Sequence, residues 1–183
     1  MKLRVYGIKQ NSSVDGPGLR YAIFVQGCPR ACPGCHNPES QEMGDEFGEL
    51  VEVQRIVDEI VKDPLLTGVS FSGGEPFLYP NECSRIIDMV KEERADMSFW
   101  AWSGYRYDEL IEDNGKLAFL EKLNILVDGP FIEDKKDLSI LWRGSSNQRI
   151  IDVPRSLAEE TIIVLPDSTW YVPDKTPKIK LHN

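Results

Sequence analysis

The sequence has no run of apolar residues that approaches the ~20 needed to cross a bilayer as a helix. The first residues also lack the apolar stretch and small-residue cleavage site of a secretory signal peptide. Basic residues are in the minority, with 21 Lys and Arg against 30 Asp and Glu, whereas a general nucleic-acid binder needs a basic face. We therefore expect a cytoplasmic protein that binds neither membranes nor nucleic acids.

Internal repeats, low-complexity tracts and linker-like segments are missing as well. A chain of 183 residues is of ordinary size for one domain and can bury a core without disulfide or metal staples. The sequence thus predicts a single domain over residues 1–183. Lys175, Lys178 and Lys180 form a small basic tail that we expect to be solvated.

Strand-like and helix-like patterns alternate along the chain. Apolar residues recur at helical spacing in two segments, residues 49–62 and 81–93, and more briefly in residues 116–122. Between them lie short apolar runs that read as strands, and weaker strand–helix signals follow: residues 20–26, 68–71, 97–102 and 124–128, then 148–153, 155–160 and 161–165. This alternation predicts an α/β fold with parallel strands, in which functional residues gather at the carboxyl ends of the strands.

Cysteine is scarce, with four residues, but Cys28, Cys32 and Cys35 lie within eight consecutive positions. Disulfides between such close neighbours would be strained, and a cytoplasmic protein keeps its thiols reduced. Clustered thiols of this kind usually serve metal or redox chemistry. At C-x3-C-x2-C spacing, three thiolates can bind three irons of a cubane cluster, and the lack of a fourth local cysteine leaves one iron open to substrate.

A zinc site is the alternative, with Cys28, Cys32, Cys35 and His36 as ligands. Cys35 and His36 are adjacent in the sequence and make awkward co-ligands, and zinc motifs follow other spacings. The fourth cysteine, Cys83, falls on the apolar stripe of a predicted helix, where free cysteine commonly serves as a small buried side chain. We therefore favour an iron–sulfur cluster and leave Cys83 out of its ligand set.

Three further turns follow predicted strands, at residues 72–75, 103–104 and 128–129. Because the carboxyl ends of parallel strands meet at one edge of a sheet, we expect these turns to share a site with the cysteine loop. The bare backbone of Gly73 and Gly74 could contact a ligand that a side chain would block.

Each of these features also has a purely structural interpretation. Residues 72–75 could form an ordinary turn between strand and helix, and Asp128 could be a simple turn residue before Gly129 and Pro130. Trp100 and Trp102 share one face of their strand by alternation, which suits core packing as well as contact with a cofactor. Residues 144–149 read as a loop, and nothing in their chemistry assigns them a role.

The sequence resembles the radical S-adenosylmethionine superfamily, and in detail the activating enzymes of anaerobic (class III) ribonucleotide reductase. The resemblance rests on blocks that follow one another along most of the chain: residues 15–20, Phe24, and residues 27–38, 72–76, 100–105, 128–131 and 143–149. It implies an α/β fold of the partial, open (β/α) barrel type with mostly parallel strands. Such a fold suits a chain shorter than the ~250 residues of a closed barrel.

The resemblance also implies two cofactors. A 4Fe–4S cluster would be held by Cys28, Cys32 and Cys35, and S-adenosyl-L-methionine would bind the open iron, with no catalytic side chain beyond the cluster and the cofactor. The residues it assigns to S-adenosylmethionine are Gly34, Cys35, His36, Gly73, Gly74, Glu75, Ser103 and Asp128. We expect His36 to serve in binding rather than in acid–base chemistry. A branched side chain at Gly74 is expected to weaken binding of this cofactor while leaving the iron content near normal.

The activity that the resemblance implies is the making of a glycyl radical. A 5′-deoxyadenosyl radical would abstract hydrogen from a glycine of the anaerobic ribonucleoside-triphosphate reductase, and a reduced flavodoxin-like protein would supply the electron. Two alternatives remain at this point: a small radical enzyme that acts on a free metabolite, and a ferredoxin-like electron carrier without catalysis. The open iron and the turn at residues 73–75 speak against the carrier.

Overall fold

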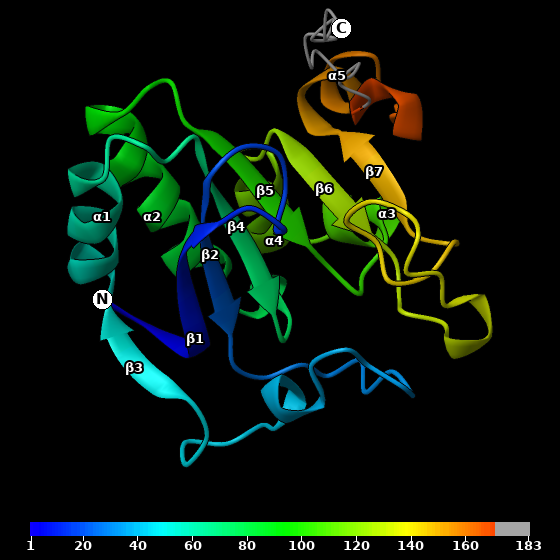
Figure 1. Ribbon diagram of the computed structural model, residues 1–183, viewed down its shortest axis with the longest axis horizontal. Coiled ribbons are helices and arrows are strands. Elements are labelled where there is room, and N and C mark those ends of the chain that lie inside the picture. Colours follow the sequence, from blue (N-terminus) through cyan, green and yellow to red (C-terminus); the bar gives the residue numbers. More distant parts are fainter. Residues whose placement is uncertain (171–183) are drawn as a thin grey trace, which may run out of the picture.

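The computed structural model describes residues 1–170, which form a seven-stranded sheet in the order β3-β1-β2-β4-β5-β6-β7 (Figure 1). The strands are β1 (Lys2–Ser12), β2 (Arg20–Val25), β3 (Glu49–Glu52), β4 (Gly68–Gly73), β5 (Ser98–Trp102), β6 (Ile125–Asp128) and β7 (Arg149–Asp152). The basic tail at Lys175, Lys178 and Lys180 lies outside the described residues. So does the last part of the span 1–183 for which one domain is predicted, and both expectations stay predictions.

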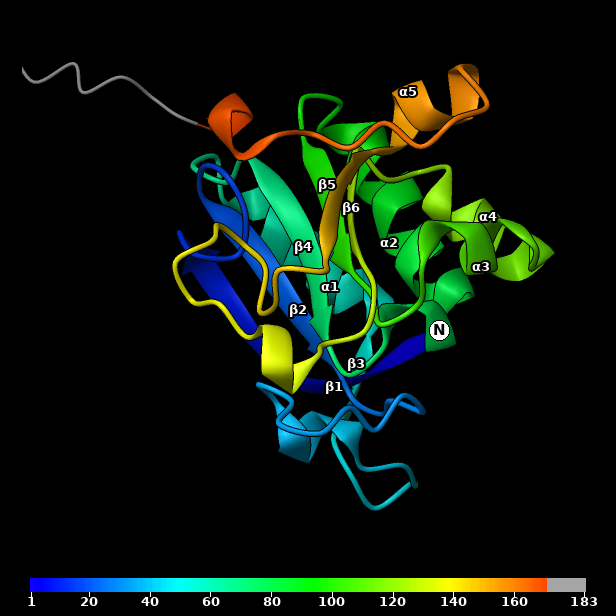
Figure 2. The same ribbon diagram turned by 90° about the vertical axis from the view of Figure 1, so that its right-hand side faces the viewer.

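The helices lie mainly on one side of the sheet. They are α1 (Val53–Lys62), α2 (Pro80–Glu93), α3 (Tyr107–Ile111), α4 (Asn114–Leu120) and α5 (Val153–Ala158), with short 3-10 turns η1 (Pro38–Gln41), η2 (Pro76–Leu78), η3 (Glu133–Lys135) and η4 (Asp167–Trp170). Figure 2 shows α2, α3 and α4 on one side of the sheet and the yellow segment between β6 and β7 on the other.

The centre of the sheet is parallel and its ends are not joined. β2, β4, β5 and β6 pair in parallel, whereas β1 and β7 pair with their neighbours in antiparallel fashion. β3 is antiparallel to β1 and therefore runs in the same direction as β2. Because β3 and β7 are the two edges of the sheet, it is open, which confirms the expectation of an α/β fold of the partial-barrel type.

The local sequence was misleading at the β3 edge of the sheet and in three other segments. Residues 49–52 were expected to begin a helix, but they form β3 because pairing with β1 overrides their helical spacing. β1 and α3 were not predicted. Residues 161–165 form no strand; there, only an isolated bridge joins Val164 to Ile151. In each case, contacts between segments distant in sequence decide the outcome, and periodicity does not report them.

The main core lies between the sheet and the helices. All side chains of β2 except Phe24 are buried, as expected for a central parallel strand covered on both faces. On the other face, Trp100 is 2 % exposed and packs edge-on against Trp142, with ring centroids 5.1 Å apart. Trp102 donates from its ring nitrogen to the carbonyl of Trp142 at 2.6 Å. In this structure the two tryptophans of β5 are packing residues, as the structural interpretation has it.

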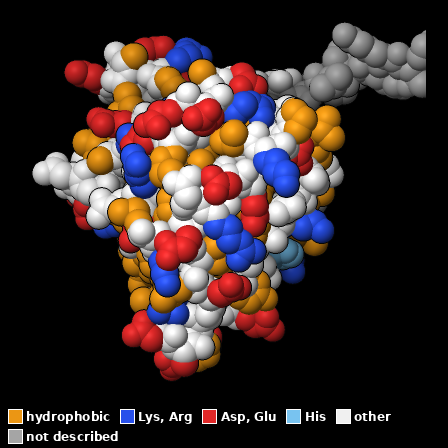
Figure 3. All heavy atoms as spheres, turned by 90° about the vertical axis from the view of Figure 1, so that its left-hand side faces the viewer, with side chains coloured by type: hydrophobic (Ala, Val, Ile, Leu, Met, Phe, Trp, Pro, Cys, Tyr) orange, Lys and Arg blue, Asp and Glu red, His pale blue; other side chains and the backbone are white. Residues whose placement is uncertain are grey.

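Figure 3 shows the face of the molecule on the side of α1. Acidic and basic side chains are interspersed across this face, and apolar side chains lie singly between them. Such a mixture is typical of a solvated surface. The chemistry of the fold is therefore best sought at the other end of the sheet, where the strand termini carry the motif residues.

Candidate functional site

The cysteine loop leaves the carboxyl end of β2 and lies below the sheet in Figure 1. Backbone hydrogen bonds hold its start in place: the Gly27 amide donates to Ser40 at 2.8 Å and the Cys28 amide to Gln41 at 3.2 Å. Farther along, the Cys35 amide donates to the Cys32 carbonyl at 3.2 Å. The base of the loop is thus fixed to η1.

The three loop thiols are half-buried and lie within electrostatic reach of one another. Burial is the main cause that raises the pKa of Cys28, and the charges of Glu75, Cys32 and Cys35 raise it further. Binding to iron removes this mutual repulsion, because the cluster's positive charge stabilises thiolates. Three gathered thiols without a fourth partner fit a 4Fe–4S cluster with one open iron.

Cys83 stands apart from this group. Its side chain is fully buried on α2, where Sγ lies 3.9 Å from the Pro76 carbonyl, and burial raises its pKa well above the ordinary value. A thiol held neutral in an apolar core is a poor metal ligand. The structure therefore agrees with the expectation that Cys83 serves packing.

The zinc alternative finds no support in the geometry. His36 is exposed. Within residues 1–170, no three His, Cys, Asp or Glu side chains are gathered so as to hold a metal ion. A tetrahedral ion needs all its ligands around one point, whereas a cubane takes each thiolate on a different iron. The choice of a cluster over zinc therefore rests on the spacing of the cysteines and on the exposed position of His36.

Gly73 and Gly74 bring β4 against the cysteine loop. The Gly74 amide donates to Val25 and the Glu75 amide to Gly27, both at 2.8 Å. A Cβ at Gly74 would lie 2.2 Å from the Gly27 carbonyl oxygen, and one at Gly73, which has φ +96°, would lie 2.7 Å from the backbone of Phe24. Both positions therefore require glycine because two backbones touch there.

This contact corrects one expectation. A side chain at Gly74 was expected to obstruct the cofactor and spare the cluster, but its Cβ would point at the carbonyl of Gly27. The first effect of a substitution is then to displace the cysteine loop itself. We therefore expect a substitution at Gly74 to affect cluster binding as well as cofactor binding.

Glu75 is a fully buried carboxylate that joins the turns after β4 and β5. It accepts hydrogen bonds from the Phe77 amide at 3.1 Å, from the Ser103 hydroxyl at 2.9 Å and from the Gly104 amide at 2.8 Å. Burial raises its pKa to about 7, although these donors oppose the shift. Three donors of the protein thus already bind this carboxylate, which makes it a link between the two turns.

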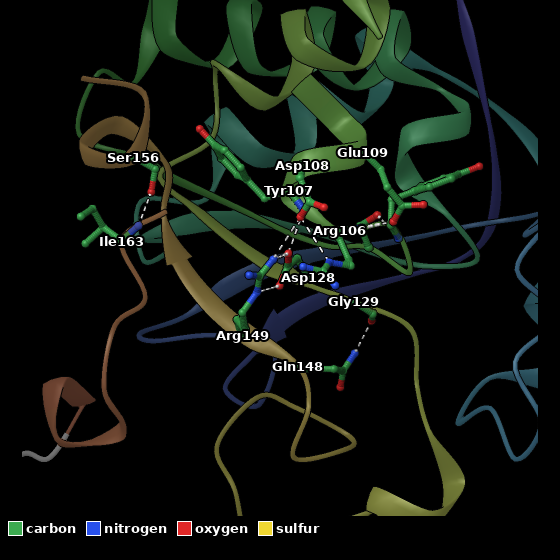
Figure 4. A network of polar contacts seen from close by, with 12 residues as sticks. Arg106, Tyr107, Asp108, Glu109, Asp128, Gly129, Gln148, Arg149, Ser156 and Ile163 are labelled. Atoms are coloured by element: carbon green, nitrogen blue, oxygen red, sulfur yellow. Dashed lines mark hydrogen bonds and ion pairs between the residues drawn. The ribbon is translucent and has the colours of Figure 1, made fainter. Parts of the chain in front are cut away.

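Asp128 ends β6 and is 1 % exposed. Arg149 at the start of β7 donates to both of its carboxylate oxygens, and the Tyr107 amide donates to one of them at 2.8 Å. Figure 4 shows this group, with Asp108 beside the Arg149 guanidinium at 3.7 Å. The buried negative charge is thereby neutralised, and the end of β6 is tied to β7 and to α3.

Residues 145–148 lie against the turn that follows Asp128 and form hydrogen bonds to it. The Asn147 amide nitrogen donates to Pro130 at 2.8 Å, and the Gln148 amide nitrogen donates to Gly129 at 3.1 Å. The Gln148 side-chain oxygen accepts from the Gly144 and Ser145 amides. The role of this segment was not derivable from the sequence. In the structure it fixes the backbone that follows β6.

The structure brings most of the predicted residues to one end of the sheet. Glu75 bonds to Gly27, which precedes Cys28, while Gly73 pairs with Val25 and the Gly74 amide donates to the same residue. Ser103 joins this group through Glu75. The Ser103 amide also donates to Val127, the neighbour of Asp128, at 2.9 Å. Gly34 and His36 lie on the exposed part of the cysteine loop. Contact of any of these residues with S-adenosylmethionine stays a prediction.

Arg30 and Arg149 are site residues that the sequence reasoning missed. The Arg30 guanidinium lies 4.8 Å from the ring centre of Tyr105 and 3.4 Å from the Glu109 carboxylate, so it ties the cysteine loop to the segment after β5. Arg149 was seen only as part of a motif block. Arg30 lies two residues after the first cysteine, and Arg149 follows a Gly-Ser-Ser-Asn-Gln run. Neither local pattern indicates which residues the arginine would contact.

Comparison with known proteins agrees with this geometry. Residues 14–151 match the family model described as a 4Fe-4S single cluster domain. The chain is 40% identical over 142 residues to the anaerobic ribonucleoside-triphosphate reductase-activating protein of Escherichia coli K12, an alignment that spans 74% of this chain and 89% of that one. The protein of the same name from Haemophilus influenzae is 39% identical over 144 residues, with 75% and 90% covered.

A third relative with this name, from Enterobacteria phage T4, is 32% identical over 141 residues, with 75% of this chain and 86% of that one covered. Among solved structures, QueE from Escherichia coli covers 57% of this chain and 53% of its own at 14% identity and a TM-score of 0.46. The sequence matches extend over nearly the whole length of the relatives and include the cysteine loop. The chain therefore belongs to the 4Fe-4S single cluster domain family and to the family of anaerobic ribonucleoside-triphosphate reductase-activating proteins.

Proposed function

We propose that this protein is a glycyl-radical activase, a radical S-adenosylmethionine enzyme that activates an anaerobic ribonucleoside-triphosphate reductase. One observation carries the proposal. The chain belongs to the reductase-activating family, and Cys28, Cys32 and Cys35 lie on one loop after the carboxyl end of a central parallel strand, with Cys83 buried elsewhere on α2. That arrangement fits a cluster with one open iron. A cluster that binds substrate needs such an iron, whereas the cluster of an electron carrier does not.

In this proposal Cys28, Cys32 and Cys35 hold the 4Fe–4S cluster. S-adenosylmethionine lies over the adjoining strand ends, near the residues that the family resemblance assigns to it: Gly34, Cys35, His36, Gly73, Gly74, Glu75, Ser103 and Asp128. When bound and reduced, the cluster supplies the electron that cleaves S-adenosylmethionine to methionine and a 5′-deoxyadenosyl radical, which takes hydrogen from a glycine of the reductase.

The chain's own residues position these groups. Gly73 and Gly74 let the backbone of β4 lie against the cysteine loop, where no side chain intervenes between them. The Glu75 carboxylate links the turns after β4 and β5, because it accepts hydrogen bonds from the Ser103 hydroxyl and the Gly104 amide. We assign Glu75 and Asp128 positioning roles, because the donors around each carboxylate are supplied by the protein.

The substrate in this proposal is a loop of another protein. The sheet is open between β3 and β7, which leaves a lateral approach for a polypeptide. A glycine suits the reaction because it has no side chain to hold the reacting carbons apart, and these must approach within about 3–3.5 Å. We further propose a reduced flavodoxin-like electron donor, a cytoplasmic location and a single domain over residues 1–183. Within the described residues, no helix is long and apolar enough to cross a membrane.

The experiment is anaerobic reconstitution of the cluster, followed by reduction in the presence of S-adenosylmethionine and the reductase from the same cell. The expected result is 5′-deoxyadenosine together with a glycyl-radical doublet in the paramagnetic resonance spectrum. The doublet is expected to be lost when the target glycine of the reductase is changed to alanine. Deoxyadenosine without a radical on the reductase, but with turnover of a free metabolite, would favour the small-molecule alternative. A reducible cluster that never cleaves S-adenosylmethionine would favour the electron carrier.

A further inference from the structure

A polar pocket of about 270 Å³ lies at the carboxyl end of β6. Its wall consists of Asp128, the turn at Gly129 and Pro130, and the side chains of four further residues, Arg106, Ile132, Asn147 and Arg149. Asp128 is one of the residues that the family resemblance assigns to S-adenosylmethionine, and the resemblance assigns the other six to neither cofactor. The pocket therefore adjoins the proposed site and shares Asp128 with it.

Asn147 offers an acceptor that the protein does not use. Its amide nitrogen donates to the Pro130 carbonyl at 2.8 Å, which fixes the direction of the amide group. Its Oδ1 atom is buried and is the one buried side-chain nitrogen or oxygen in residues 1–170 that has no hydrogen-bond partner. An unpaired buried acceptor is costly, by about 1–3 kcal/mol, so a ligand that brings a donor is favoured here.

The remaining polar groups of the pocket define what the ligand must carry. Asp128 is already bonded by Arg149 and by the Tyr107 amide, so its carboxylate is not the group that awaits a ligand. What remains is one acceptor, Asn147 Oδ1, in a pocket that is also lined by Arg106 and Arg149. Arg149 uses two of its guanidinium nitrogens on Asp128 and Arg106 uses one on Asp108, so each arginine keeps further N–H groups for a ligand. A peptide unit is the complement of this set, because it has one N–H to donate and one carbonyl to accept.

The position of the pocket favours a polypeptide from outside. Arg149 is the first residue of β7, and β7 is an edge of the open sheet. β2, which leads into the cysteine loop, lies three strands away from β6 in the sheet order, a separation of roughly 14 Å at ordinary strand spacing. Figure 4 shows Arg106, Asp128 and Arg149 close together beside the segment between β6 and β7.

We propose that this pocket binds the main chain of the reductase's glycine loop, with Asn147 Oδ1 accepting a backbone N–H of that loop and Arg106 or Arg149 donating to a backbone carbonyl. The inference rests on the proposed function for the identity of the partner. It assigns a substrate-binding role to Asn147, which neither the family resemblance nor the comparisons provide.

The test compares Asn147→Ala with Gln148→Ala. Both variants lose a bond from residues 145–148 to the turn after β6, but only the first removes the unpaired acceptor. Binding of a synthetic peptide that spans the glycine loop of the reductase is measured by calorimetry on the cluster-loaded enzyme with S-adenosylmethionine present. Asn147→Ala is expected to weaken peptide binding about tenfold, the value of one good hydrogen bond, and Gln148→Ala less than about twofold.

A second experiment removes the hydrogen-bond donor from the peptide instead of the acceptor from the enzyme. Peptides are methylated at one backbone nitrogen at a time, and one position is expected to weaken binding to the wild type about tenfold but to have no further effect on Asn147→Ala. The dissociation constant of S-adenosylmethionine, measured without peptide, is expected to stay within about twofold of wild type. If it rises while peptide binding is unchanged, the pocket serves the cofactor and the inference is wrong.

Two other results would also overturn it: equal losses in Asn147→Ala and Gln148→Ala, which indicate only a loosened turn, and no loss in either. The proposed function fails separately. A wild-type enzyme that binds the peptide but forms no glycyl radical on the reductase contradicts the activity and leaves the peptide site standing.

Discussion

The backbone amide of Glu75 donates a 2.8 Å hydrogen bond to the carbonyl of Gly27, the residue that precedes the first cysteine of the loop. The same residue's side chain holds the amide of Gly104 after the next strand. One residue thus fixes the relative positions of three neighbouring strand ends. The cysteine loop is anchored through its backbone, which explains why so much of the site depends on glycine.

The first prediction concerns the cluster ligands. Replacing Cys28, Cys32 or Cys35 by alanine is expected to abolish normal cluster binding, because each thiolate is the only protein ligand of one iron. Cys83→Ala is the matched control, since it removes a buried thiol of the same size from α2. It is expected to retain the cluster and to lose about 1–2 kcal/mol of stability. Iron and sulfide analysis of the four variants decides, and a cluster lost only in Cys83→Ala would refute the assignment.

The second prediction concerns the contact between β4 and the cysteine loop. Gly74→Ala is expected to lower iron and sulfide content and to destabilise the protein by about 1–3 kcal/mol, because the new Cβ would overlap the Gly27 carbonyl. Gly7→Ala in β1 is the control, since its Cβ would meet nothing within 4 Å. We expect it to change stability by no more than about 0.5 kcal/mol. Normal iron content in Gly74→Ala would show that the cysteine loop can shift to accommodate the new Cβ without losing the cluster.

The third prediction is a pH dependence caused by Glu75. Its pKa is raised to about 7 in the folded chain, above the value of about 4.3 in an unfolded one. The folded state therefore binds more protons between these two values, and the free energy of unfolding falls as pH rises through that window. The fall is about 4 kcal/mol in total and is nearly complete above about pH 7.

Glu75→Gln removes the titrating group, so its stability is expected to lack this decline. The measurement is urea denaturation of the cluster-free chain between pH 5 and pH 8, for the wild type and the variant. The difference between the two curves is the quantity of interest, because all other titrating groups contribute to both. Parallel curves across this range would contradict the raised pKa.

The fourth prediction concerns the ion pair at the end of β6. Arg149→Met is expected to cost about 3 kcal/mol, because it leaves the buried carboxylate of Asp128 with the Tyr107 amide as its remaining donor. Arg155→Met is the control, since Arg155 pairs with Glu159 at the surface of α5 and is expected to cost no more than about 0.5 kcal/mol.

Adding Asp128→Asn to Arg149→Met is expected to restore part of the lost stability, because the neutral amide needs no counter-ion. Thermal or urea denaturation of the single and double variants gives the coupling between the two residues. Simple additivity of the two substitutions would show that the pair contributes nothing to the fold.

Much of the fold could be predicted from the sequence because the relevant signals are local. Apolar runs and helical spacing located β2, β4, β5, β6 and the helices α1, α2 and α4 to within a few residues. One edge escaped prediction, whereas the other, β7, had a weak signal at residues 148–153. β3 carries a helical pattern, but its partner β1 lies more than 35 residues earlier in the chain, and pairing at that distance leaves no periodic trace.

The sequence by itself determined the chemistry of the site: three clustered thiols, glycines at strand ends, and motif blocks that identify the family. Tertiary structure alone decided what the charged residues do. Folding buries Glu75 and Asp128, whose expected contact with the cofactor stays a prediction, and a buried carboxylate must take its donors from the nearest backbone and side chains. Those donors, Gly104 for Glu75 and Arg149 for Asp128, come from other strands and loops, because the sheet order places them there.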